Sequence, residues 1–143
     1  MNSNIFLANS DDEINACFPV LAELRPHVSR EEFLLRIKRQ TAESGYRLAC
    51  AVDGDVKAVA GFRISECLAW GKFMYVDDLV ARSADRSKGF GGALFDWLVE
   101  YARENNCDQF HLDSGVQRFG AHRFYLQKRM AIEAHHFGLK LRG

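Results

Sequence analysis

The spacing of apolar residues divides the first half of the chain into a strand, two helices and a β-hairpin. Capping boxes at Ser10–Glu13 and Ser29–Glu32 each precede apolar residues at helical spacing. Pro26 lies near the end of the first helix and Gly45 is placed to end the second. Asp53-Gly54 is a two-residue turn signal. The predicted elements are a strand over 5–8, a helix from Ser10 to about Pro26, a helix between Ser29 and Gly45, and hairpin strands over 46–52 and 56–64.

The second half alternates strands and helices. The apolar pattern predicts a strand over 73–81, a helix over 93–104, a strand over 110–113, a helix over 118–128 and a strand over 132–141. In the last segment the apolar phase slips between Ala134 and Phe137, which indicates a bulge. Hairpin strands followed by a strand–helix–strand crossover predict an α/β fold, with a mixed sheet and helices on its faces, in a single domain over 1–143.

Composition limits the function classes. The 143 residues carry 19 Lys plus Arg and 19 Asp plus Glu, and this balance favours neither nucleic acid nor a membrane as partner. The first residues lack the basic and apolar regions of a secretory signal, so we expect a cytoplasmic protein. The four cysteines form no closely spaced pair and are expected to be reduced, mostly packed thiols.

The segment Arg86-Ser87-Lys88-Gly89-Phe90-Gly91-Gly92 joins the predicted strand 73–81 to the helix that follows. Free N–H groups at a helix start attract phosphate, glycines allow close approach, and Arg86 and Lys88 add charged donors. The simplest physical interpretation is a pyrophosphate site; the alternative is a glycine-rich helix start that binds nothing. The P-loop spacing is absent, and Leu94 stands where a dinucleotide fingerprint needs glycine.

The pattern Arg86-x-x-Gly89-x-Gly91, followed downstream by Ala121-His122-Arg123-Phe124-Tyr125, resembles the GCN5-related N-acetyltransferase (GNAT) superfamily. The predicted element order is also that of the superfamily. The resemblance implies a GNAT-like fold and a direct transfer of acetyl from acetyl-CoA to an amine of a small molecule or protein. It also implies that residues 86–92 hold the pyrophosphate, and that the backbone of Leu79-Val80-Ala81 pairs with the pantetheine arm.

The same resemblance implies the catalytic groups. Tyr125 is the expected general acid, and its alternative is an aromatic anchor of an amphipathic helix. Asp77 or Asp78 is the expected base or amine-attracting group. Strict alternation would place Asp77 on one face with Tyr75 and Leu79, and Asp78 on the other with Val76 and Val80. We favour Asp77 from the family pattern, while both residues as ordinary polar strand positions remain the alternative.

Two nearby positions depart from the pattern or extend it. Many GNAT proteins have Asn where this chain has Arg118, so Arg118 is assigned to the cofactor site without a defined role. His122 lies one turn before Tyr125 and is a candidate to line the same site, and its alternative is an ordinary polar or partly buried histidine. The histidines lack metal-ligand spacing, and no metal is expected.

The rival to an enzyme is a non-catalytic acyl-CoA-binding module, which would need neither Tyr125 nor the Asp pair. The acceptor amine is undefined by the sequence. Homodimerisation through the C-terminal strands is common in the superfamily, and no motif in this chain specifies it.

Overall fold

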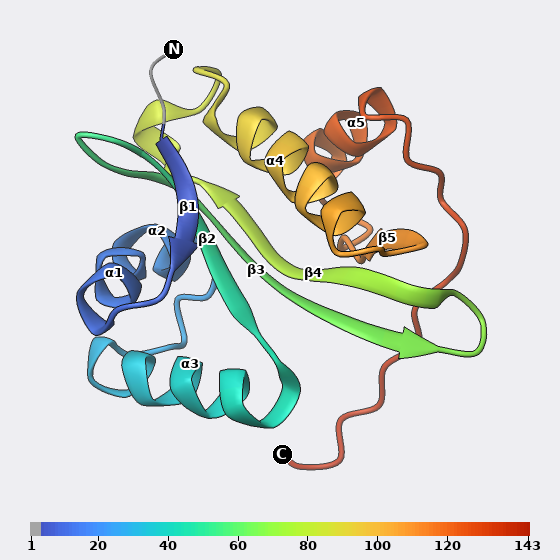
Figure 1. Ribbon diagram of the computed structural model, residues 1–143, viewed down its shortest axis with the longest axis horizontal. Helices are drawn as coiled ribbons and strands as arrows, with labels where there is room; N and C mark the ends of the chain where they lie inside the picture. The colour runs from blue at the N-terminus through green and yellow to red at the C-terminus, as the bar shows by residue number, and fades with distance from the viewer. Residues whose placement is uncertain (1–3) are drawn as a thin grey trace. The chain divides into compact units, whose positions relative to one another are not determined.

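The structure, a computed structural model, describes residues 4–143 (Figure 1). The start of the N-terminus, on which the expectation about a secretory signal partly depends, lies outside the described residues. The elements are β1 (Asn4–Ala8), α1 (Asp11–Ala16), α2 (Phe18–Leu24), α3 (Arg30–Ser44), β2 (Arg47–Asp53), β3 (Asp55–Cys67), β4 (Gly71–Ala81), the 3-10 turn η1 (Ser83–Asp85), α4 (Phe90–Glu104), β5 (Gln109–Leu112) and α5 (Phe119–Gln127).

The chain forms two compact units, one ending at His111 and the other running from Leu112 to Gly143. The first holds the sheet and most of the helices, and the second holds α5 and the C-terminal segment. The single domain expected from the sequence stays a prediction.

The sheet has the strand order β1-β2-β3-β4-β5. The first four strands pair antiparallel with their neighbours, and β5 lies next to β4 after the α4 crossover. The backbone N–H of Asp108, just before β5, donates to the carbonyl of Lys72 near the start of β4 at 2.6 Å. The predicted mixed α/β fold is therefore confirmed.

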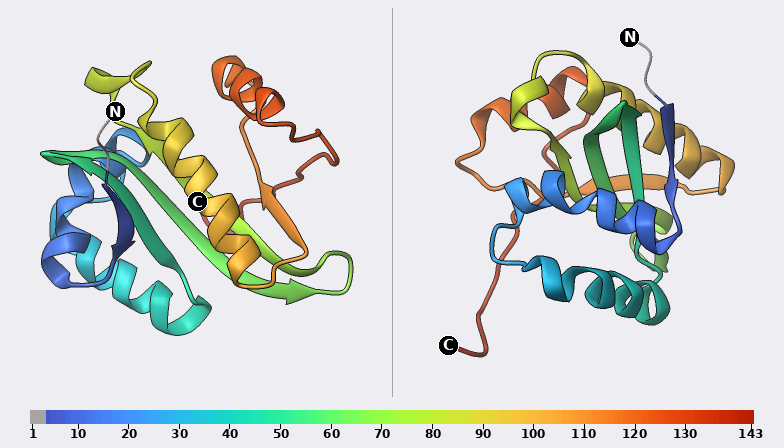
Figure 2. Two further views of the ribbon diagram at one scale, coloured as in Figure 1. Left: turned by 45° about the horizontal axis from the view of Figure 1, so that its top comes forward. Right: turned by 90° about the vertical axis from the view of Figure 1, so that its left-hand side faces the viewer.

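Helices cover both faces of this sheet (Figure 2). On one face, residues of α1, α2 and α3 pack with alternate residues of β1 to β4, including Val59 and Val80. On the other face, Tyr101 of α4 meets Phe62 of β3 edge to face, with ring centroids 5.6 Å apart. Buried apolar side chains therefore lie on both sides of the central strands.

The first predicted helix is two helices. α1 ends at Ala16 and α2 begins at Phe18, with Cys17 between them. Pro19 has no N–H with which to continue the hydrogen bonds of α1. It fits the first turn of a new helix, because backbone N–H groups at that position have no helical partner in any case. One continuous helix and two successive helices have the same spacing of apolar residues, so periodicity alone did not reveal the break.

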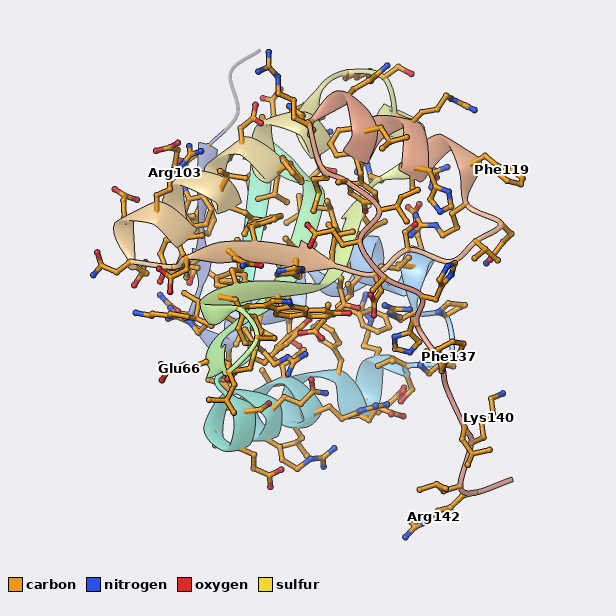
Figure 3. All side chains as sticks on the ribbon, turned by 90° about the vertical axis from the view of Figure 1, so that its right-hand side faces the viewer. Glu66, Arg103, Phe119, Phe137, Lys140 and Arg142 are labelled. Atoms are coloured by element: carbon orange, nitrogen blue, oxygen red, sulfur yellow. The ribbon has the colours of Figure 1, made fainter. Side chains whose placement is uncertain are left out.

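The predicted last strand is wrong, because residues 130–140 have no regular secondary structure. Phe137 is 92% exposed, and Ile132, Leu139 and Leu141 are nearly as open. Figure 3 shows Phe137, Lys140 and Arg142 projecting from this segment. A period-two apolar pattern gives a stable strand only where a sheet edge pairs with it and one face is buried, and neither condition is met here.

Two β-bulges interrupt the ladders. Ala51 pairs with Ala58 and Val52 with Val56, which leaves Lys57 as an extra residue in β3. Gly61 pairs with Asp78 and Phe62 with Val76, which leaves Asp77 as an extra residue in β4. Both extra residues are charged and form ion pairs, Lys57 with Asp55 at 2.7 Å and Asp77 with Arg63 at 2.8 Å.

Candidate active site

The glycine-rich segment forms the start of α4. The helix begins at Phe90, earlier than predicted, and its N-cap Gly89 has φ 88°, a left-handed conformation that suits glycine. Ser87 is also left-handed, with φ 73°. The first helical bond runs from the N–H of Ala93 to the carbonyl of Gly89. The N–H groups of residues 90–92 therefore precede the helical ladder and can receive an anion.

Gly91 is not required by packing within the chain. A Cβ built on it would lie 3.6 Å from the Cβ of Ala81, an ordinary contact. Alanine is a better helix former than glycine, so a glycine here weakens the first turn. The bare backbone at this point favours a ligand that approaches closely.

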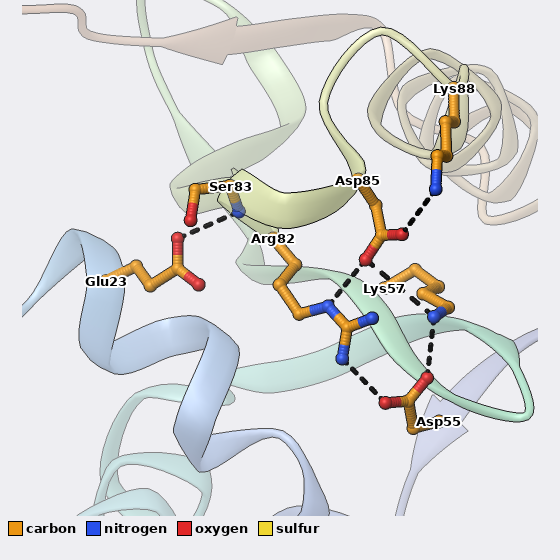
Figure 4. A network of polar contacts seen from close by, with 7 residues as sticks. All are labelled: Glu23, Asp55, Lys57, Arg82, Ser83, Asp85 and Lys88. Atoms are coloured by element: carbon orange, nitrogen blue, oxygen red, sulfur yellow. Dashed lines mark hydrogen bonds and ion pairs between the residues drawn. The ribbon is translucent and has the colours of Figure 1, made fainter.

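A buried carboxylate lies directly before the segment. Asp85 is only 6% exposed and accepts hydrogen bonds from Arg82 Nε at 2.5 Å and Lys88 Nζ at 3.1 Å (Figure 4). Lys57 Nζ lies 3.7 Å from the same carboxylate. The hydrogen bond from Arg82, with that from Lys88, holds the pKa of Asp85 below its usual value. The carboxylate thus stays charged and orders three cations beside the helix start.

The cations of the segment differ in their partners. Lys88 is ion-paired with Asp85, although its side chain is 62% exposed. Arg86 is exposed and caps the η1 turn through its backbone N–H, which donates to the carbonyl of Ser83. Asp55 shares Arg82 and Lys57 with Asp85, so three cations face two carboxylates. The cluster has a net positive charge, which suits an anionic ligand.

The end of β4 has a backbone edge that β3 does not use. The N–H of Arg82 donates to the carbonyl of Lys57 at 2.8 Å, so it points toward β3. Hydrogen-bonding direction alternates along an antiparallel strand. Leu79 and Ala81, which pair across from Ala60 and Ala58, therefore direct their N–H groups away from β3, and Val80 directs its own toward it.

Asp78 lies on the face covered by α1 to α3. Its carboxylate accepts hydrogen bonds from the Tyr46 hydroxyl at 2.6 Å and from Arg25 Nε at 2.8 Å. Burial, followed by the charge of Asp78, raises the pKa of Tyr46 well above its ordinary value. Tyr46 therefore remains a hydroxyl donor, and the carboxylate is fixed from two sides.

Asp77 has a different environment. Arg63 Nε and Nη2 bind its two carboxylate oxygens at 2.8 and 2.9 Å, and its backbone carbonyl accepts from Arg25 Nη2 at 3.0 Å. This bidentate pair raises the pKa of Arg63. Both oxygens of Asp77 thus bind one guanidinium, whereas those of Asp78 bind Tyr46 and Arg25, and Asp78 also lines a cavity.

A cavity of about 180 Å³ lies beside Asp78, between the sheet and α2 and α3. Asp78 is the one carboxylate among its lining residues, and Asp77 is not among them. The cavity also contains Arg25, Arg36 and the buried Tyr46. Because Asp78 precedes Leu79 directly, the cavity and the open edge of β4 are adjacent along one strand.

The remaining predicted site residues belong to the second unit. Arg118 is the N-cap of α5, and the His122 ring lies 2.8 Å from the carbonyl of Gly115. Tyr125 packs edge to face on Phe124, with centroids 5.4 Å apart. Burial raises the pKa of Tyr125, and the Arg118 guanidinium opposes this effect. At neutral pH the phenol is therefore protonated and able to donate.

Comparison with known proteins places these features in a family. The sequence model of the acetyltransferase (GNAT) family matches residues 10–130. The chain belongs to the GNAT acetyltransferase family. An uncharacterized N-acetyltransferase of Bacillus subtilis (strain 168), YhdJ, is 31% identical over 130 residues, which cover 90% of this chain and 92% of that protein.

Solved structures share the fold. A GNAT family acetyltransferase of Staphylococcus aureus gives a TM-score of 0.81 at 18% identity, with 99% of this chain and 100% of that one covered. A ribosomal-protein-alanine N-acetyltransferase of Brucella melitensis gives 0.82 at 19% identity, with 98% and 100% covered. GNAT proteins use acetyl-CoA as co-substrate, and the expected family is confirmed.

Several residues of the candidate site were missed from the sequence. Arg25, Tyr46 and Arg36 come from segments with no motif, and only their lining of the cavity identifies them. Asp85 was overlooked although it directly precedes the Arg86 segment, a position that could have drawn attention to it. Within residues 4–143 no helix is long and apolar enough to cross a membrane. The same residues contain no cluster of His, Cys, Asp or Glu suited to a metal ion.

Proposed function

We propose that this protein transfers acetyl directly from acetyl-CoA to a primary amine. The observation that carries the proposal is the continuity of β4. Its Asp78 borders a cavity, its Leu79 and Ala81 direct their N–H groups away from β3, and η1 then leads to the start of α4. An acceptor site, a thioester site and a pyrophosphate site thus follow one another along one stretch of chain.

The donor would be held by backbone and charge. The N–H groups of residues 90–92 and the cations Arg86 and Lys88 suit the pyrophosphate. The outward N–H groups of Leu79 and Ala81 suit the amide groups of the pantetheine arm and the thioester carbonyl. A hydrogen bond to that carbonyl stabilises the negative charge that develops on oxygen when the amine attacks. Arg118 and His122 are further candidates for contact with the donor.

The acceptor would enter the cavity with its amine toward Asp78. The carboxylate attracts the ammonium form and receives its proton, directly or through water, before the free amine attacks the thioester carbon. We assign this role to Asp78 rather than Asp77, because Asp78 lines the cavity and Asp77 does not. A new C–N bond forms, the C–S bond breaks, and CoA leaves as a thiolate.

Tyr125 is the proposed proton donor to that thiolate. Its raised pKa keeps the phenol protonated through the neutral range. Replacing it with phenylalanine removes the proton and keeps the ring. We expect Tyr125→Phe to lower kcat by about a hundredfold, in the range of general acid catalysis, and to leave acetyl-CoA binding unchanged.

The first experiment is a thermal-melt titration with acetyl-CoA, with CoA and ATP for comparison. A ligand that binds only the folded state stabilises it by about 2.7 kcal/mol at a hundredfold excess over Kd. We expect a shift with both CoA species and none with ATP. No shift at millimolar acetyl-CoA would contradict the donor site.

Turnover separates an enzyme from an acyl-CoA-binding module. With a panel of amines, acetyl transfer that is lost in Tyr125→Phe supports the enzyme. Binding of CoA without transfer to any amine supports the module. Asp78→Asn should raise the KM for the amine more than Asp77→Asn does, and equal effects would remove the assignment of Asp78.

A further inference from the structure

We propose that the cavity beside Asp78 accepts an apolar monoamine that carries an anionic group, and that it discriminates against polyamines. This inference names the acceptor class and rests on the function proposed above. It follows from the lining of the cavity, which combines an apolar wall with one carboxylate and two guanidinium groups.

The apolar wall of the cavity indicates the chemical character of the middle part of the acceptor. Two aromatic and four aliphatic residues contribute to it: Phe18, Phe33, Leu21, Ala22, Val28 and Ile37. Phe18 and Phe33 meet edge to face, with centroids 5.1 Å apart, and Phe33 is only 2% exposed. Removing apolar surface from water against such a wall favours a substrate with a ring or branched chain over a polar one.

The charged side chains of the cavity indicate where the two ends of the acceptor would bind. Asp78 is the single carboxylate in the lining and is the natural partner for the reacting ammonium. Arg25 already binds Asp78 through Nε and the carbonyl of Asp77 through Nη2. The rest of the polar lining consists of His27, Arg36, Gln40 and Tyr46, which offers no second anion.

Arg36 would bind the end of the acceptor opposite the reacting amine. Its Nη1 donates to Glu32 at 2.7 Å one turn earlier on α3, and Glu32 does not line the cavity. The guanidinium has five N–H donors, so one such bond leaves others for a substrate carboxylate. A second ammonium placed there would lose part of its hydration and be repelled by Arg36, and the nearby Glu32 carboxylate is already paired with that guanidinium.

Three probes of matched shape test this inference: benzylamine, 4-(aminomethyl)benzoate and p-xylylenediamine. Their para substituents are hydrogen, a carboxylate and an ammonium-bearing methylene. We expect kcat/KM to be highest for the benzoate, lower for benzylamine and lowest for the diamine, with about tenfold between neighbours, the scale of a charged hydrogen bond.

Variants of Arg36 and of a control lysine test whether Arg36 causes the preference for the benzoate. Arg36→Gln should remove most of the advantage of the benzoate over benzylamine and leave the KM for acetyl-CoA unchanged. Arg36→Lys should restore part of it. Lys38→Gln is the control, because Lys38 lies on the same helix, carries the same charge and pairs with Asp11 outside the cavity. It should preserve the order of the three probes.

The outcomes separate this inference from the function on which it rests. If the protein binds no acetyl-CoA, the proposed function fails. If it binds acetyl-CoA and acetylates the diamine or spermidine best, the function stands and the acceptor class is overturned. Acetyl-CoA binding with no turnover of benzylamine or the benzoate overturns the acceptor class as well, as does an Arg36→Gln variant with an unchanged order.

Discussion

The ring of Tyr46 occupies the space over Gly61 that any side chain on that residue would fill. A Cβ built on Gly61 would overlap the hydroxyl and ring of Tyr46. Gly61 pairs across the ladder with Asp78, to which the Tyr46 hydroxyl donates at 2.6 Å. A glycine on β3 therefore admits the ring that fixes the carboxylate of β4.

Gly61→Ala should destabilise the protein by about 1–3 kcal/mol, the usual cost of overpacking a filled core. The displaced Tyr46 should also release Asp78, which would raise the KM for the acceptor. Denaturant unfolding and steady-state kinetics measure the two effects. A double variant with Tyr46→Leu should recover part of the stability, because the clash is removed.

Gly120→Ala is the control for this substitution. The nearest atom to a Cβ at Gly120 is the end of the Arg123 side chain, 3.9 Å away. Alanine should therefore leave stability unchanged or raise it by up to about 1 kcal/mol, since alanine favours the helix. A loss at Gly120 as large as that at Gly61 would contradict the packing argument.

Gly91→Ala should separate folding from binding. Its Cβ has room, so stability should be unchanged or rise by about 0.5–1 kcal/mol. A methyl group on the first turn of α4 would obstruct a pyrophosphate, so the Kd for acetyl-CoA should increase. Calorimetric titration and thermal melts test both halves, and normal affinity in the variant would argue against a close approach at this position.

Gly89→Ala is the matched comparison. Gly89 is left-handed, with φ 88°, where alanine is strained. This variant should lose stability by about 1–2 kcal/mol, the cost of forcing an L-residue into that region. The two glycines, two residues apart, are thus expected to respond with opposite signs in the unfolding measurement.

Asp85→Asn should weaken acetyl-CoA binding by about tenfold, a loss typical of charged hydrogen bonds. Removal of a negative charge near an anion site would by itself strengthen binding. We expect the reverse because Asp85 orders Arg82 and Lys88 beside the helix start. Titrations with CoA and with pantetheine measure the effect, which should disappear for pantetheine because it lacks the pyrophosphate.

Asp55→Asn provides the charge-matched control. Asp55 contacts Arg82 and Lys57 from the exposed side and does not hold Lys88. Its loss should leave the affinity for CoA unchanged or raise it. If Asp55→Asn and Asp85→Asn bind CoA equally tightly, the ordering role of Asp85 is wrong.

Acid should remove the contribution of Asp55 to stability. Hydrogen bonds from Lys57 and then Arg82 lower the pKa of Asp55 from 3.8 to about 2. A lowered folded-state pKa gives stability that is present above 3.8 and is lost as the pH falls toward 2. The difference in unfolding midpoint between the native protein and Asp55→Asn should therefore shrink across this interval. High salt should reduce the difference at every pH, and a constant difference would contradict the ion pairs.

Local signals in the sequence predicted most of the elements. The capping box at Ser10, the left-handed Gly45 and the turn at Gly54 were confirmed, since each acts within a few residues of chain. The break before Pro19 and the missing last strand were not foreseen. A helical or period-two pattern shows where apolar residues recur and does not show whether the ladder continues or a partner strand exists.

The candidate site was only partly predictable. The segment 86–92 has a recognisable motif because glycine directly determines the backbone shape of this turn. The face of Asp78 depends on a bulge whose signal lies in the pairing with β3, so alternation placed it with Val76, and the structure separates the two residues. Arg25 and Arg36 reach the cavity through the packing of helices, for which the sequence contains no local sign.

The bulge in β4 determines which face of the sheet carries the carboxylate of Asp78. Val76 pairs with Phe62, which contacts α4, whereas Asp78 pairs with Gly61 on the opposite face. Without the bulge, Asp77 would take a regular place opposite Gly61, and every later side chain of the strand would turn over. The carboxylate would then face an apolar helix and the N–H groups of Leu79 and Ala81 would point into the ladder. The candidate site therefore depends on how β4 pairs with β3 as well as on which side chains β4 carries.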